Sequence, residues 1–102
     1  MNPKHGPVEK TLALELGRHI FRARVALGVK QEYVAEVLGL RARGSVSNWE
    51  KGRRLIREPD WERLRRKAEL PLPEYRDVEV GVMVALSGAP FSSSIVAALS
   101  AA

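Results

Sequence analysis

Residues 31–54 read QEYVAEVLGLRARGSVSNWEKGRR, and they contain two short apolar segments separated by a turn. Apolar residues recur at helical spacing before Gly39, and again at Val46 and Trp49 before Gly52. Between the two segments lies the turn 40–43, which carries two arginines. The pattern predicts a helix over about 31–38 and another over about 44–51, joined by a tight turn.

Helical spacing continues on both sides of this stretch. A helix is predicted over about 8–27 because one apolar stripe runs through Leu12, Leu16, Ile20, Ala23 and Leu27. Gly28 is its expected C-cap residue. Pro59 suits the first turn of a further helix over about 59–70, with Trp61 and Leu64 facing inward. Residues 1–7 contain two prolines and a glycine, and we expect a loose N-terminal arm.

The end of the chain differs in composition, because no charged residue occurs from Val80 to Ala102. Valines alternate with other residues over 78–84, the period of a strand, so a strand is predicted over about 78–86. A turn at 87–90 and a short helix over 92–101 would follow. We therefore expect a mainly α fold of four to five helices over 8–76, with a strand and a helix in an apolar extension over 77–102.

Composition narrows the classes of function. The chain has 102 residues, a formal net charge of +5 and a pI of about 10.1, which favours nucleic acid as a partner. From Arg41 to Arg57 there are six basic residues and one acid. The chain has no cysteine and two histidines, so we expect no disulfide, metal site or cofactor, and no enzyme activity. We also expect no signal peptide and no membrane span, and hence a cytoplasmic protein.

The region from about Leu12 to Leu70 resembles the lambda-repressor/Cro (XRE) family of helix-turn-helix proteins. Gln31 at the start of a helix, the small Ala35, the Trp-Glu-Lys-Gly run at 49–52 and an arginine seven residues before Gln31 carry the resemblance. The turn is one residue longer than is usual in the family, and Lys30 replaces the common Thr or Ser N-cap. The resemblance implies that the helix over about 44–51 enters the major groove of double-stranded DNA, and that Arg24 and Glu50 form a structural ion pair.

Side-chain chemistry within this motif suggests individual contacts. Arginine can bind guanine and asparagine can bind adenine through two hydrogen bonds each. Base contacts are predicted for Arg43, Gly44, Ser45, Ser47 and Asn48. Phosphate contacts are predicted for Gln31, Arg41, Lys51, Arg53 and Arg54. Four further basic residues are read as a solvated helix face, namely Arg63, Arg65, Arg66 and Lys67.

The apolar extension suggests a protein partner. Dimerisation is predicted through Val80, Val82, Val84, Ile95 and Leu99. The alternatives are that the extension completes the core of its own domain or binds another protein. We therefore expect a dimeric DNA-binding repressor of prokaryotic or phage type, associated with the nucleoid, that reads a palindromic operator. The alternative function is an antitoxin that represses its own operon and binds a partner protein through its tail.

Overall fold

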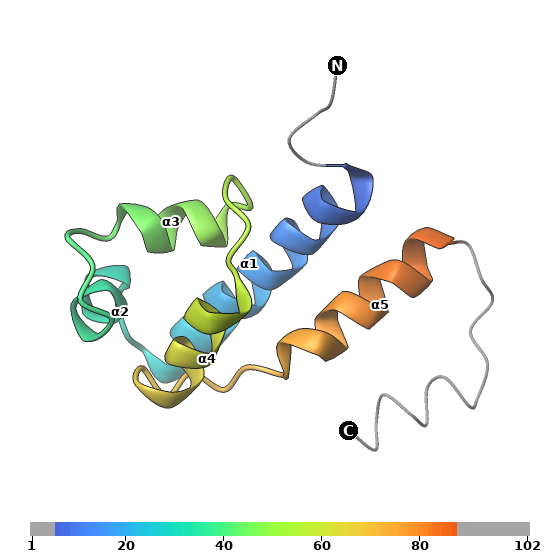
Figure 1. Ribbon diagram of the computed structural model, residues 1–102. Coiled ribbons are helices and arrows are strands. Elements are labelled where there is room, and N and C mark those ends of the chain that lie inside the picture. The colour runs from blue at the N-terminus through green and yellow to red at the C-terminus, as the bar shows by residue number, and fades with distance from the viewer. Residues whose placement is uncertain (1–5, 88–102) are drawn as a thin grey trace.

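The computed structural model describes residues 6–87, which form five helices (Figure 1). In chain order these are α1 (Pro7–Leu27), α2 (Gln31–Val37), α3 (Gly44–Glu50), α4 (Glu58–Arg66) and α5 (Tyr75–Ser87). The protein is mainly α, and no strand occurs within residues 6–87. The helices predicted over 8–27, 31–38 and 44–51 are confirmed to within a residue at each end. Gly28 is the C-cap of α1, with a φ of 71°.

The fourth helix is shorter than predicted. It was expected over 59–70, but α4 ends at Arg66 and the chain then turns. Glu69 adopts a φ of 54°, a left-handed conformation that ends helical geometry. Because of this turn, Leu70 and Leu72 are buried in the core beyond the end of the helix.

The strand predicted over 78–86 is wrong, because these residues belong to α5. A period-two run also contains residues four apart, and such residues share one face of a helix. Val78 and Val82 are four apart and are 8% and 5% exposed, whereas Val80 and Val84 are half-buried. A strand would need a second strand for its backbone hydrogen bonds, and within residues 6–87 there is none. The domain boundary predicted between residues 76 and 77 also falls inside α5.

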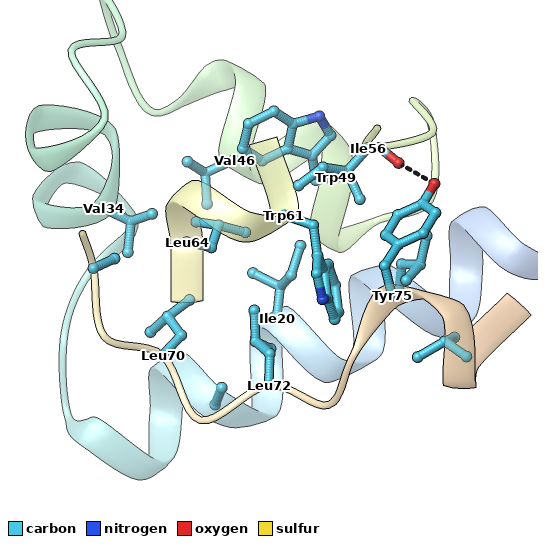
Figure 2. Packing of buried hydrophobic residues seen from close by; sticks show 14 of the residues in the cluster. Ile20, Val34, Val46, Trp49, Ile56, Trp61, Leu64, Leu70, Leu72 and Tyr75 are labelled. Atoms are coloured by element: carbon cyan, nitrogen blue, oxygen red, sulfur yellow. Dashed lines mark hydrogen bonds between the residues drawn. The ribbon is translucent and has the colours of Figure 1, made fainter. Parts of the chain in front are cut away.

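The core lies around α1, with α3 on one side and α5 on the other (Figure 1). Its largest fully buried side chains are Leu16 and, as Figure 2 shows, Trp61, Ile20, Ile56, Leu64, Val34 and Val46. Every helix except α5 contributes to this set, and α5 adds Tyr75, Val78 and Val82 to the same cluster. No buried side-chain nitrogen or oxygen among the described residues lacks a hydrogen-bond partner.

Two aromatic side chains join α5 to the rest of the core. The indole nitrogen of Trp61 donates to the Pro73 carbonyl at 2.9 Å. The Tyr75 hydroxyl donates to the Ile56 carbonyl at 2.7 Å (Figure 2). The two rings pack edge to face with centroids 5.9 Å apart. Burial is the main cause that raises the pKa of Tyr75 above its usual value of 10.0.

Replacing Tyr75 with Phe should therefore destabilise the protein by about 1–2 kcal/mol, because the Ile56 carbonyl loses its donor.

The raised pKa of Tyr75 means that the folded state holds the phenolic proton more tightly than the unfolded state. The stability of the wild type should thus be independent of this group below pH 10 and fall as the pH rises through the pKa of folded Tyr75. Urea unfolding from pH 8 upward measures both effects. Tyr33→Phe, at an exposed site, is the control and should change neither.

Gly17 sets how closely α1 and α3 approach. A Cβ atom at this position would lie 2.2 Å from the Trp49 carbonyl oxygen and 2.8 Å from that of Glu50. Both oxygens belong to the backbone of α3, so a side chain would force the helices apart. Gly81 in α5 is a contrasting case, since a Cβ atom there would meet no atom within 4 Å.

The two glycines therefore form a matched pair for mutation. Helix propensity alone favours alanine over glycine by about 1 kcal/mol in a helix interior. Gly81→Ala should raise the free energy of unfolding by up to this amount. Gly17→Ala should lower it by about 1–3 kcal/mol, because the new side chain would clash with α3. The free energy of unfolding in urea measures both. A Gly17→Ala protein as stable as Gly81→Ala would contradict the close crossing.

Candidate nucleic-acid interface

The turn between α2 and α3 orients the two helices. Gly39 adopts a φ of 73°, and the Leu40 amide donates to the Ala35 carbonyl at 2.8 Å, which closes the end of α2. Ala35 is 2% exposed, and Val34 and Val46 are fully buried. Since the buried residues of α3 are Val46 and Trp49, the opposite face of this helix is turned away from the core.

That outward face carries most of the predicted base-contacting residues. Gly44 is exposed, and Ser47 and Asn48 are half-buried on the same side of α3. Arg43 occupies the N-cap position of the helix and is exposed. Ser45 lies apart from the others, because it lines a hollow beside Trp49 on the flank of α3.

A hydrogen-bonded ion pair holds α3 against α1. The Nε atom of Arg24 lies 2.7 Å from Oε2 of Glu50, and Nη2 donates to Oε1 at 3.2 Å. The Nη1 atom of Arg24 also donates to the Val29 carbonyl, at 3.0 Å. The side chains of Arg24 and Glu50 are 15% and 5% exposed, so the pair is largely shielded from water. The ion pair predicted from the sequence is confirmed.

Gln31 extends this ion pair to the start of α3. Its side-chain nitrogen donates to Oε1 of Glu50 at 2.9 Å, and its side-chain oxygen accepts from Nη1 of Arg43 at 3.4 Å. Nε of Arg43 also lies 3.7 Å from Oε2 of Glu32. Arg24, Glu50, Gln31 and Arg43 thus form one chain of polar contacts, which we call the α1–α3 relay. The sequence placed Gln31 as a phosphate ligand, whereas here its amide bridges Glu50 and Arg43.

The remaining predicted phosphate ligands lie near the two ends of α3. Arg41 is exposed in the turn before the helix, and Lys51 is exposed at its C-cap. The backbone amide of Arg53 donates to the Asn48 carbonyl at 2.9 Å, and that of Arg54 at 3.4 Å, so the following loop folds back onto α3.

This loop borders a hollow of about 480 Å³ beside α3. Arg53 and Arg54 line it together with Arg57, which the sequence did not single out as a phosphate ligand. Its place in the run of basic residues from Arg41 onward was the available signal.

The basic face of α4 is only partly a free surface. Arg63 donates to the Leu38 carbonyl at the end of α2 and pairs with Asp60 at 3.2 Å. Arg65 pairs with Glu62 at 3.0 Å. Of the four residues of the predicted solvated face, Arg66 and Lys67 are exposed, whereas Arg63 and Arg65 are half-buried. Arg63 instead joins α4 to α2, a role that no local sequence pattern indicates.

Of the residues predicted for dimerisation, the three that the structure describes do not share one face of α5. Val82 is buried against the core, because the helical geometry of α5 turns it toward α1. Val80 and Val84 are half-buried, and Ile95 and Leu99 lie outside the described residues. Residues 75–87 therefore complete the core of their own domain, one of the alternatives open from the sequence. The exposed large apolar side chains of α5 are Met83 (59%) and Leu86 (44%).

Residues 6–87 contain no group of three or more potential metal-ligating side chains, and none of their helices is long and apolar enough to cross a membrane. Comparison with models of protein families, with curated proteins and with solved structures finds no match to this chain.

The α1–α3 relay can be tested through its buried end. Arg24→Ala should lower the free energy of unfolding by roughly 3 kcal/mol, because the carboxylate of Glu50 would stay shielded from water without its cation. The matched control is Arg18→Ala on the same helix, where Arg18 and Glu15 form an exposed pair at 3.4 Å. That change should cost less than about 0.5 kcal/mol. Equal losses in urea unfolding would contradict a structural role for Arg24.

Proposed function

We propose that the protein is a sequence-specific regulator of transcription that binds double-stranded DNA, with α2 and α3 acting as a helix-turn-helix. The observation that carries the proposal is the α1–α3 relay, which ties α1, α2 and α3 together and ends on the exposed Arg43 at the start of α3. The ion pair between Arg24 and Glu50 is thus linked through Gln31 to Arg43, an exposed side chain that takes no part in the core. Three residues of the relay, Arg24, Gln31 and Glu50, are among those that carried the resemblance to the lambda-repressor/Cro family.

The dimensions of α3 suit the major groove. An α-helix with its side chains is about 10–12 Å in diameter, and the major groove of B-DNA is about 12 Å wide. Gly44 and Ser47 are small, so the backbone of α3 can approach the base edges closely. Arg43 would bind O6 and N7 of guanine, and Asn48 would bind N6 and N7 of adenine.

Cations at both ends of α3 support the same placement. A helix in the major groove lies between two phosphate backbones, so phosphate ligands are needed on both sides. Arg41 lies before α3, and Lys51, Arg53, Arg54 and Arg57 follow it. These contacts would supply much of the affinity and make it decrease steeply with salt.

We further propose that the protein acts as a homodimer on a palindromic operator, in a prokaryotic or phage context. Two such helices about 34 Å apart would meet successive major grooves on one face of DNA. Because Val82 is buried, the dimer surface would involve the outer face of α5, where Met83 and Leu86 are exposed.

The same exposed side chains support a second candidate, an antitoxin that covers another protein with this face. A protein that is soluble and dimeric when expressed alone favours the repressor. One that aggregates unless it is produced with a partner favours the antitoxin.

Selection of bound sites from a random duplex pool, at two salt concentrations, tests the proposal directly. We expect a palindromic consensus that contains guanine and adenine at fixed positions.

Asn48→Ala should relax the preference at one base pair by about 1–3 kcal/mol. Lys51→Ala should weaken binding to all sequences alike and reduce the salt dependence. A pool that shows no enrichment at either salt concentration would exclude sequence-specific recognition.

A further inference from the structure

Glu32 is the acidic residue closest to the predicted reader Arg43. It lies in the first turn of α2, and its Oε2 atom is 3.7 Å from Nε of Arg43. Both side chains are well exposed, at 65% and 61%, so burial does not force them together. Sequence reasoning did not select Glu32, since an acid in the first turn of a helix is also favoured by the helix dipole.

We propose that Glu32 determines specificity, by supporting Arg43 for contact with a guanine edge and by opposing contact of Arg43 with phosphate. The inference rests on the proposed function, because it concerns how α3 distinguishes bases from backbone. It gives the acidic side chain a role on a surface that otherwise needs positive charge.

The guanidinium geometry allows Arg43 to bind Glu32 and guanine together. Arginine has five N–H donors in a planar fork. Glu32 faces the Nε side of this fork. The two Nη atoms can then turn to O6 and N7 of guanine, once Nη1 gives up its 3.4 Å contact with Gln31. Glu32 would restrict the side chain to the orientation that guanine needs.

Phosphate is a less favourable partner for the same arrangement. A phosphate that approaches Arg43 also approaches the carboxylate of Glu32, and the two negative charges repel each other. The edge of guanine carries no net charge, so it avoids most of this repulsion. Glu32 should therefore weaken non-specific binding more than it weakens binding to the correct site.

Glu36 provides a matched control on the same helix. It lies one turn after Glu32, and both line a hollow of about 240 Å³ with Arg41 and Arg43. Glu36 forms no ion pair with Arg43 among the described residues, whereas Glu32 does. Glu32→Gln and Glu36→Gln raise the net charge equally, so their difference isolates the contact with Arg43.

The experiment measures dissociation constants of the full chain for three duplexes: the selected site, the same site with the guanine opposite Arg43 replaced, and a random duplex. Glu32→Gln should bind the random duplex about threefold to fivefold more tightly than Glu36→Gln does, the range of an exposed ion pair. It should not gain affinity for the selected site, so its discrimination against the replaced guanine should decrease. In an Arg43→Ala background the two glutamine variants should behave alike.

Three results would overturn the inference. Equal effects of the two glutamine variants would mean that Glu32 acts only through net charge. A difference that persists in the Arg43→Ala background would mean that Glu32 acts through the start of α2, which thermal unfolding of each variant would also reveal. If the selected site shows no preference for guanine, or if that preference does not depend on Arg43, then Arg43 does not read guanine and the inference fails. Absence of any DNA binding by the wild type is a distinct outcome, because it rejects the proposed function first.

Discussion

The ion pair between Arg24 and Glu50 is the interaction on which the α2–α3 surface depends. Both α2 and α3 have seven residues, and helices of this length are not stable in water without tertiary contacts. The pair joins α3 to the 21-residue α1, and the bond from Gln31 to Glu50 brings in the start of α2. Its charges are tolerated away from water because each has further hydrogen bonds, to the Val29 carbonyl and to Gln31. Gly17 then allows the backbones to approach closely enough for this contact.

Much of the helical architecture could be predicted from local pattern. The stripe in α1 repeats over many turns, and the two short helices are marked by glycines that end them. The prediction was wrong for α5, because four alternating valines satisfy the period of a strand and also place Val78 and Val82 on one helix face. A strand and a helix at this position differ in where the backbone makes its hydrogen bonds. A strand needs a neighbouring strand, and whether one is present depends on the rest of the molecule. The turn at Glu69 was missed for a related reason, since a glutamate carries no local signal for a left-handed conformation.

In the candidate site too, some features could be predicted from the sequence and others could not. The pairing of Arg24 with Glu50, residues 26 apart, was inferred from a family pattern, and no local rule predicts it. Residue type and helical spacing suggested Arg43 and Asn48 as candidate base contacts, and the structure places Arg43 exposed at the N-cap of α3 and Asn48 on its outward face. They were not enough for Glu32, Arg63 or Gly17. Each of these contacts a residue of another element, and such a contact cannot be inferred before the position of that element is known.

The arrangement of α1 separates the two surfaces of the protein (Figure 1). Gly17 and Arg24 are seven residues apart and face α3, whereas Thr11, Glu15 and His19 recur every four residues and line the groove toward α5. Burial in this groove lowers the pKa of His19, so a neutral side chain is favoured beside the valines of α5. A partner that binds the outer side of α5 therefore need not cover α3. Because one continuous helix supports both surfaces, a dimer formed through α5 would hold its two α3 helices at a defined spacing, and this is the geometric requirement for reading two half-sites at once.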